Sequence, residues 1–499
     1  MYLSRPIRVS LLPEPSVTEA ILAELERDAA FAAGAPFVEL AAGFLAENGA
    51  GAVPVSPADT AEALAARFAE PMPKAGRPLA EVVERIRRDI LPSAIRLSHP
   101  MYLGHQVSAP LPAAVWSEVV ASALNNSLAV REMSPGGTAL ETQLVRWLAA
   151  LAGFGPEAGG TLTSGGTEAT FTALLAARAA VLPDAWTAGV GDDPPVLVAG
   201  EHAHYAVSRA AGELGLGTSR VVTVPSRSWA MDPDALAATL DRLRAEGRRV
   251  MAVVATAGST ATGSFDDLCR IGPLCAERGL WLHVDAAHGA SALLSAAHRH
   301  RLDGLSLARS IAWDPHKMML VPLSAGMVLV REERDLEAAF AQRAPYLFHG
   351  GDGRLWDQGT RSAQCSRRFD ALKVWVALQR YGAEGIGALY DRLVAVTEAL
   401  HRDVAGRADF QAVHAPECNI LCFRYAPAGV PDGPALDELN RALRERYNRS
   451  GQGWLTTTML GGRRVLRVTV MNPRSTEAHT AALLDGLAAE GGRLLAGSG

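Results

Sequence analysis

The stretch that decides the fold reads RVMAVVATAG at residues 249–258 and GLWLHVDAA at residues 279–287. Both runs are rich in β-branched and aliphatic residues, and the helix-like segment 268–277 lies between them. Nearly continuous apolar strands joined by a helix are typical of parallel strands that are buried on both faces. We therefore predict a βαβ unit here, and with it an α/β fold.

The same alternation extends over the middle of the chain. Further strand candidates are 195–200, 219–225 and 325–332, and further helix candidates are 144–152, 168–181 and 233–246. A mainly parallel sheet binds its ligands in the loops beyond the carboxyl ends of the strands. Residues 99–374 are therefore predicted to form a large ligand-binding domain.

The flanking regions have other patterns. Residues 1–98 predict helices, for example at 16–45 and 79–90, which are split by Gly/Pro-rich connectors. Such a segment suits an arm that packs on a partner subunit, and equally a simple helical cap. Residues 375–499 contain the strand candidates 419–425 and 465–472 beside helical stretches, which predicts a small C-terminal α+β domain.

Composition excludes several classes of protein. A chain of 499 residues is longer than one hydrophobic core usually serves, so we expect two or three domains. The net charge of -5, without a Lys/Arg block, argues against a nucleic-acid partner. The five cysteines lack metal-ligand spacing, which predicts a reducing compartment and no metal site. Without a signal-peptide pattern or an apolar run of about 20 residues, we expect a cytoplasmic protein that does not contact a membrane.

The motif WDPHKMM at residues 313–319 places Lys317 in an apolar loop flanked by methionines. Burying an ammonium group is costly unless the group is paired or neutralised. A Schiff base would solve that problem and would use the amine chemically. Taken alone, such a lysine is more often a surface residue whose stem lies along apolar neighbours. The surrounding motifs are therefore needed to distinguish a Schiff-base lysine from a surface lysine.

Asp285 ends the apolar strand within HVDAAHGA. A buried carboxylate needs a cationic partner, and a protonated pyridine nitrogen would supply one. A capping or ladder role for this aspartate is equally compatible with the sequence.

A glycine-rich turn follows another strand-like segment in TLTSGGTEAT, residues 161–170. Free backbone N–H groups and the Thr167 hydroxyl at a helix start would make a cradle for phosphate. Two further loops place His204, in EHAHYAVSRAA, and Thr260, in ATAGSTATGSFDDL, after strands. A lone histidine is more often structural. In order along one scaffold, however, the motifs form a phosphate cradle, a ring stacker, a pyridinium acid and a lysine.

These motifs resemble those of the group II pyridoxal-phosphate (PLP)-dependent amino-acid decarboxylases, which include the glutamate, cysteine-sulfinate, aromatic-amino-acid and diaminobutyrate enzymes. The similarity runs from about His99 to Pro473 and includes HPMYLGH, WLHVDAAHGA, WDPHKMM, QCSRRFDALKVW and VLRVTVMNP. The resemblance implies the aspartate-aminotransferase-like type I fold, also called PLP-dependent transferase-like. It also implies PLP as cofactor and a homodimer with its active sites at the interface.

The resemblance assigns roles position by position. Lys317 would hold PLP as a Schiff base, Asp285 would pair with the ring nitrogen, and His204 would stack on the ring; these three are the predicted catalytic residues. The implied cofactor-binding set is Gly165, Gly166, Thr167, His204, Thr260, Asp285, Ala287, His316 and Lys317. Arg467 matches the arginine that binds the substrate carboxylate.

The implied reaction is decarboxylation of an L-amino acid to an amine and CO2. An alternative on the same scaffold is oxidative deamination or decarboxylation-dependent transamination to an aldehyde. It stays open because a family tyrosine thought to protonate Cα is missing from the loop at residues 349–368. Trp356 stands near its place, and His204 or His349 are the alternative proton donors.

The substrate itself stays open. Gly104 and His105 stand where the glutamate and cysteine-sulfinate branch carries Asn-Gln, which looks more like the diaminobutyrate branch. We predict His105, Trp356 and Arg467 as substrate-binding residues. A non-enzymatic protein with a PLP fold is a third interpretation, against which the intact set of Lys317, Asp285 and His204 argues.

Overall fold

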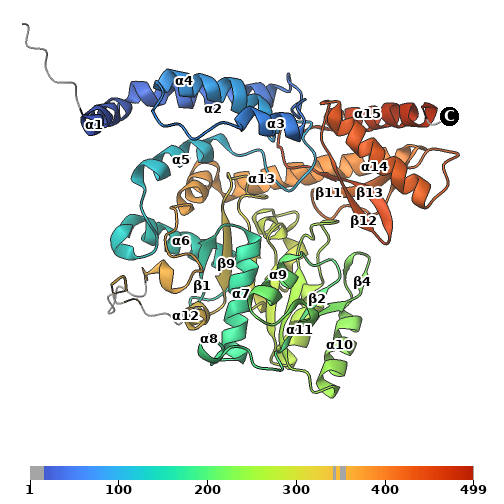
Figure 1. The fold of residues 1–499 in the computed structure, drawn as a ribbon. Helices are drawn as coiled ribbons and strands as arrows, with labels where there is room; N and C mark the ends of the chain where they lie inside the picture. The colour runs from blue at the N-terminus through green and yellow to red at the C-terminus, as the bar shows by residue number, and fades with distance from the viewer. Residues whose placement is uncertain (1–15, 341–343, 345, 349–355, 498–499) are drawn as a thin grey trace, which may run out of the picture. The chain divides into compact units, whose positions relative to one another are not determined.

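The computed structural model describes residues 16–340, 344, 346–348 and 356–497. The chain divides between Ile95 and Arg96 into two units, which are described separately (Figure 1). The division into three domains at residues 98 and 374 stays a prediction.

A seven-stranded sheet forms the centre of the unit 96–499 (Figure 1). Its strands, in spatial order, are β1 (Gly159–Thr163), β9 (Gly326–Val330), β8 (Ser310–Trp313), β7 (Trp281–Asp285), β6 (Val250–Thr256), β2 (Val196–Gly200) and β3 (Val221–Val224). From β8 to β3 all neighbours pair in parallel, whereas β9 runs antiparallel to both β1 and β8. The predicted α/β fold with a mainly parallel sheet is confirmed.

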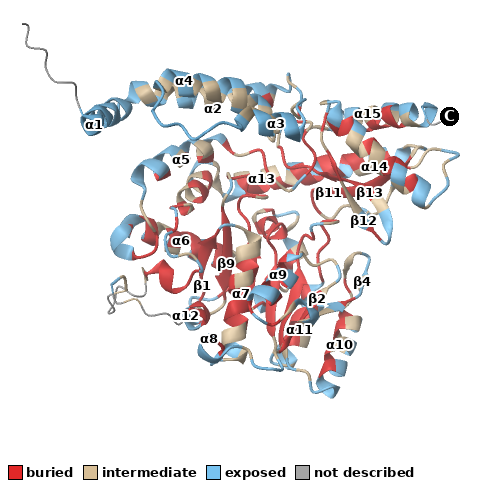
Figure 2. Cartoon of the chain, in the orientation of Figure 1, coloured by how far each residue is buried: buried red, intermediate tan, exposed pale blue. Residues whose placement is uncertain are grey.

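Helices cover the sheet on both faces, so its central strands are almost entirely buried, whereas the edge strand β3 is partly exposed (Figure 2). Along β6, Val253 and Ala255 belong to one hydrophobic cluster, and Ala252 and Val254 belong to the other. This alternation follows from the two-residue period of a strand. The helices are α5 (Pro112–Leu124), α6 (Pro135–Leu151), α7 (Gly166–Val181), α8 (Ala185–Ala188), α9 (Ala206–Glu213), α10 (Pro233–Ala245), α11 (Leu268–Glu277) and α12 (Arg334–Ala339).

The C-terminal part contains an antiparallel sheet packed with helices, as predicted. The long helix α13 (Ala371–Gly406), broken by the non-helical Gly382, leads into it. The other elements are β10 (Phe410–Ala412), β11 (Ile420–Tyr425), α14 (Pro434–Arg449), β12 (Thr456–Leu460), β13 (Arg463–Thr469) and α15 (Glu477–Ala496). A small hairpin, β4 (Ser226–Arg227) and β5 (Ala230–Met231), lies in the larger part.

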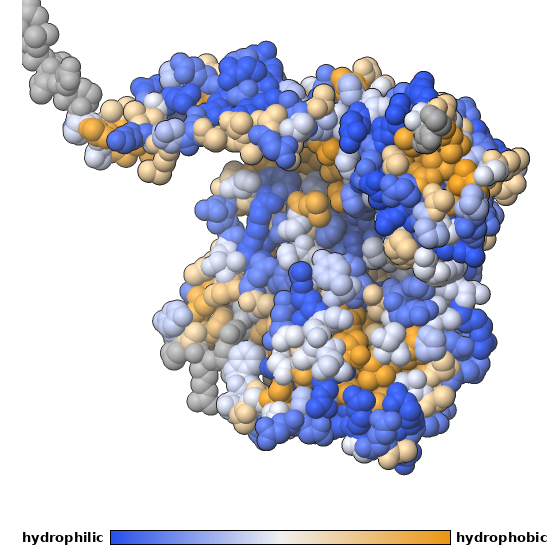
Figure 3. Space-filling view, turned by 45° about the vertical axis from the view of Figure 1, so that its right-hand side comes forward, coloured by the Kyte–Doolittle hydropathy of each residue, from blue (hydrophilic) through white to orange (hydrophobic). Residues whose placement is uncertain are grey.

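The unit 1–95 is helical where it is described, and its helices are α1 (Val17–Asp28), α2 (Phe31–Ala50), α3 (Ala61–Phe68) and α4 (Leu79–Arg85). The single helix predicted at 16–45 is wrong, because the backbone turns extended at Ala30 and starts a second helix. Large apolar side chains are exposed on this unit, and Figure 3 shows apolar patches among hydrophilic ones along it.

Membrane spans were sought among the described helices. None of them is by itself long and apolar enough to cross a bilayer. Helices α1 and α2 satisfy the length and composition criteria only as a pair, which is bent by 60°.

A buried ion pair ties α6 and β1 to the segment before α13. The Arg367 guanidinium donates to both carboxylate oxygens of Glu141, at 2.6 and 2.9 Å, and neither residue is exposed. Glu141 also accepts a hydrogen bond from the backbone N–H of Leu162 in β1. Removing one partner of such a pair strands the other charge in the interior.

We expect Arg367→Leu to lower the free energy of unfolding by about 3–5 kcal/mol, because Glu141 would lose the one cationic partner that it has among the described residues. Chemical denaturation followed by circular dichroism measures the change. Arg242→Ala is the control, since it breaks an exposed pair between Arg242 on α10 and Glu246 directly after this helix, and should have little effect. Equal midpoints for the two variants would contradict the prediction.

Candidate active site

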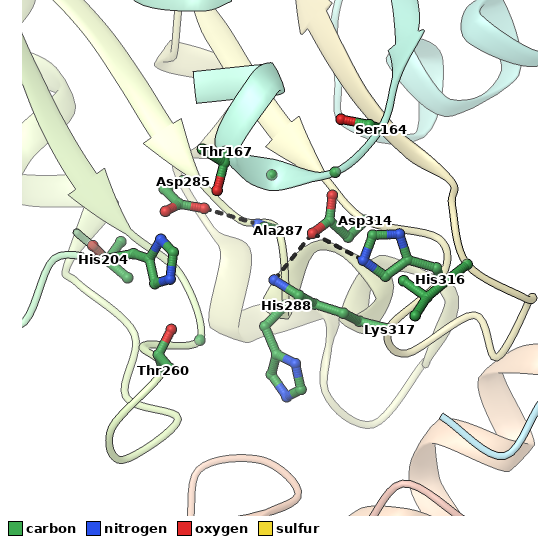
Figure 4. Close-up of a pocket in the computed structure, with 15 residues that line it drawn as sticks. Ser164, Thr167, His204, Thr260, Asp285, Ala287, His288, Asp314, His316 and Lys317 are labelled. Carbon is green, nitrogen blue, oxygen red and sulfur yellow. Dashed lines mark hydrogen bonds and ion pairs between the residues drawn. The ribbon is translucent and has the colours of Figure 1, made fainter. Parts of the chain in front are cut away.

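A cavity of about 330 Å³ opens at the carboxyl ends of β6, β7 and β8 (Figure 4). This is the edge at which a parallel sheet binds its ligands. The cavity is lined by Ser164, Gly165, Gly166, Thr167, His204, Thr256, Gly258, Thr260, Asp285, Ala287, His288, Asp314, His316, Lys317 and Leu323. The whole predicted cofactor-binding set is therefore brought together in one place.

Lys317 has an acidic partner in the cavity. Its Nζ lies 3.0 Å from Oδ2 of Asp314, a side chain that is almost completely buried. The attraction between the two charges offsets the free-energy cost of removing the ammonium group from water. Sequence reasoning gave Asp314 no role, although its position three residues before the lysine was the available signal.

His316 supports the same carboxylate. Its Nδ1 accepts a hydrogen bond from the backbone N–H of Ala325, so its hydrogen is on Nε2, which faces Asp314 Oδ2 at 3.5 Å. Burial is the main cause that lowers the pKa of His316, and the imidazole is therefore neutral near pH 7.

The chain has three lysines, at positions 74, 317 and 373. Lys74 is exposed in the unit 1–95. Lys373 is buried against the carboxylates of Glu118 and Asp370, at 2.8 and 3.0 Å. Lys317 is thus the one lysine side chain that lines the cavity.

Asp285 ends β7 and is 8% exposed. Its Oδ1 accepts a hydrogen bond from the backbone N–H of Ala287, at 3.2 Å. Among the described residues, no lysine or arginine lies within ion-pair distance of it. A buried carboxylate without a cation suits a ligand that brings one, such as a protonated pyridine nitrogen.

The start of α7 has room for an anion. No side chain caps this helix, whose first residues, Gly166 and Thr167, line the cavity (Figure 4). The first N–H groups of a helix have no partner within the helix and can bind an anion. A Cβ on Gly166 would lie 2.8 Å from the Cβ of Ala287 and 3.0 Å from Asp314 Oδ2. The close approach of these segments therefore requires a glycine, and the site fits a phosphate group.

His204 and Thr260 enter the cavity from the loops after β2 and β6 (Figure 4). The Nδ1 of His204 accepts a hydrogen bond from the backbone N–H of Ala206, and its ring lies 4.1 Å from the ring of Tyr205. Burial lowers the pKa of His204, and the negative charge of Asp285 opposes that shift. A largely neutral imidazole is thus held at the cavity wall.

The predicted substrate-binding residues do not line this cavity. His105 is exposed and Trp356 is half-buried. Arg467 lies on β13, is 6% exposed, and donates from Nε to the carbonyl of Ala261, next to Thr260. Its Nη2 has no hydrogen-bond partner among the described residues. His349 lies outside the described residues.

Comparison with known proteins decides the family. A family model described as "Pyridoxal-dependent decarboxylase conserved domain" matches residues 62–426. The chain belongs to this family.

Alignments with several known proteins extend over most of this chain. It is 35% identical over 422 residues to the L-2,4-diaminobutyrate decarboxylase of Rhizobium meliloti (strain 1021), a match that covers 84% of this chain and 83% of that protein. The cysteine sulfinic acid decarboxylase of Rattus norvegicus is 32% identical over 422 residues, covering 81% and 84%. The crystal structure of mouse CSAD in apo form matches with a TM-score of 0.86 at 28% identity, covering 93% of this chain and 99% of that one. The chain is a PLP-dependent carboxy-lyase that decarboxylates an amino acid.

We expect Lys317→Ala to lose covalent attachment of PLP, because neither other lysine lies at the cavity. Borohydride reduction of the holoenzyme followed by peptide mass spectrometry should find the cofactor on the peptide that contains Lys317. Lys74→Ala is the control and should leave that labelling unchanged. Label on the peptide of Lys373, or label retained by Lys317→Ala, would refute the assignment.

Proposed function

We propose that this cavity holds PLP and releases CO2 from an L-amino acid, with Lys317, Asp285 and His204 as the catalytic residues. The observation that carries the proposal is a pair of opposite charges facing one cavity: the amine of Lys317, paired with the buried Asp314, and the buried carboxylate of Asp285, which has no cationic partner among the described residues. When bound, PLP supplies the electron sink for the carbanion that loss of CO2 leaves.

Each side chain has a separate task. Lys317 would hold the cofactor, and Asp314 would keep the lysine amine positioned within the cavity. Asp285 would hold a proton on the ring nitrogen, and His204 and Ala287 would contact the ring. The phosphate is bound by the α7 start with His316, and Thr260 lies beside the ring.

Arg467 is proposed to bind the substrate carboxylate. Its guanidinium is buried, leaves Nη2 without a partner among the described residues, and contacts the loop that carries Thr260. A carboxylate would satisfy this donor and its charge together. His105, whose pKa is lowered by burial and then by the charge of Arg467, is proposed as a second contact of the same ligand, because that charge acts on its imidazole. Trp356 is retained as a third substrate contact.

The protein is proposed to act as a cytoplasmic homodimer. Large apolar side chains of the unit 1–95, among them Val17, Phe31 and Met72, are more than four-fifths exposed, and burial against a second copy would remove them from water. The cysteines, all of them free, suit a reducing compartment.

The proposed reaction is tested with purified holoenzyme and a panel of L-amino acids, with CO2, amine, aldehyde and peroxide measured together. We expect CO2 and the amine in equal amounts. Aldehyde with ammonia or peroxide in place of the amine would favour the alternative reaction. No CO2 from any member of the panel would overturn the proposal.

We expect Arg467→Met to lower kcat/KM by about 100-fold or more, mainly through KM, because truncating a buried charged contact costs roughly 2–5 kcal/mol. PLP absorbance of the variant should persist, since Arg467 contacts the substrate and not the cofactor. Arg463→Met, an exposed position on the same strand, is the matched control. Loss of PLP binding in Arg467→Met, or an unchanged KM, would contradict the assignment.

A further inference from the structure

His288 lines the cavity but has no part in the mechanism above. It follows Ala287 directly after β7 and is 3% exposed. Figure 4 shows its imidazole ring on one side of the Lys317 side chain, with Asp314 on the other. A buried polar ring in this position needs partners for both of its nitrogens.

One nitrogen of the ring has a fixed partner. His288 Nε2 lies 2.7 Å from Oδ1 of Asn419, the residue before β11. The Asn419 amide is oriented by the backbone, because its Nδ2 donates to the carbonyl of Val470 at 2.8 Å. Oδ1 can only accept, so the hydrogen of the imidazole must be on Nε2.

The other nitrogen, Nδ1, is therefore a bare lone pair. It has no hydrogen-bond partner among the described residues, although it is buried. Burial is the main cause that lowers the pKa of His288 to about 3, and the positive charges of Lys317 and Arg467 lower it further. The ring is neutral at physiological pH, so Nδ1 accepts a hydrogen bond and has no proton to give.

The positive charges of Lys317 and Arg467 both act on the His288 ring. Lys317 is the end at which the substrate amine joins the cofactor, and Arg467 is the proposed carboxylate end. His288 lines the same cavity as Lys317. The substrate carboxylate carries only acceptors and cannot donate to Nδ1. An N–H or O–H group on the substrate side chain would satisfy Nδ1.

We propose that His288 determines substrate specificity: its Nδ1 accepts a hydrogen bond from an N–H or O–H group on the side chain of the amino acid. This inference rests on the proposed function. The site then favours side chains that carry a donor, such as an ammonium group, over carboxylate or sulfinate side chains, whose lone pairs would face that of Nδ1. A positive side chain is tolerated because the substrate carboxylate neutralises Arg467 and Asp314 neutralises Lys317.

Two variants test the hydrogen bonds of the two His288 nitrogens separately. In His288→Gln, the amide nitrogen can keep the donor to Asn419, but the acceptor at the Nδ1 position is lost. In His288→Asn, the amide oxygen can replace the Nδ1 acceptor, but the donor to Asn419 is lost. A purely structural histidine would depend on the bond to Asn419, whereas a specificity residue depends on the acceptor.

The probes are pairs of similar size that differ by a donor: L-2,4-diaminobutyrate with L-norvaline, and L-tyrosine with L-phenylalanine, with L-glutamate as the acidic probe. We measure kcat/KM on holoenzymes with matched PLP absorbance and take the ratio within each pair that is turned over. The wild type should prefer the donor-bearing member by about 10-fold or more. His288→Gln should lose that preference, and His288→Asn should keep most of it.

The outcomes distinguish the two proposals. No CO2 from any member of the panel of L-amino acids, with PLP attached to Lys317, would sink the proposed function and this inference with it. If CO2 is released and the ratio of kcat/KM within a probe pair is the same in the wild type and His288→Gln, the inference is overturned but the proposed function is not. A wild-type preference for L-glutamate, or loss of the ratio in His288→Asn but not in His288→Gln, would also overturn it.

Discussion

The parallel register of β6, β7 and β8 is the constraint on which the site depends. Thr256 pairs with Asp285, and Asp285 pairs with Ala312, so three strands end at one edge of the sheet. The loops that follow them are far apart in sequence and leave the sheet side by side. A slip of one residue would turn Asp285 to the opposite face. Because both faces are packed with apolar side chains, such a slip is strongly disfavoured.

Some charged groups in and near the cavity have an ionic partner in the protein, and others lack one. The unpaired groups are those that the cofactor and the substrate would pair with. Lys317 has Asp314 as its partner, whereas Asp285 and Arg467 have no ionic partner among the described residues. An unpaired buried charge is costly, so a protein retains one where a ligand completes it. The two unmatched groups have opposite signs, as a protonated ring nitrogen and an amino-acid carboxylate require. A stable core elsewhere tolerates this local cost.

Much of the fold could be predicted because the strong patterns are local. The strands at β6, β7 and β11 were expected within two or three residues of their observed ends, since long apolar runs have a clear signal. β8 was missed, because its four residues, Ser-Ile-Ala-Trp, contain a single β-branched residue, whereas all four residues of the equally short β3 are β-branched. Helix α6 begins at Pro135, well before the predicted start, because Gly136 and Gly137 resemble a loop. Gly137 packs against Phe369 instead, and that contact is not visible in the sequence. The antiparallel direction of β9 likewise depends on its neighbours.

By itself the sequence determined the class of fold, the cofactor and most of the residues that line the cavity, though not Asp314 or His288, because motifs such as WDPHKMM carry their chemistry in consecutive residues. Only the tertiary structure decided which charges are paired and which nitrogen of His288 carries the hydrogen. That hydrogen is placed by Asn419, which lies 131 residues away along the chain, and by the carbonyl of Val470. Protonation and pairing depend on the atoms packed against a group, and packing joins segments whose proximity no local pattern records.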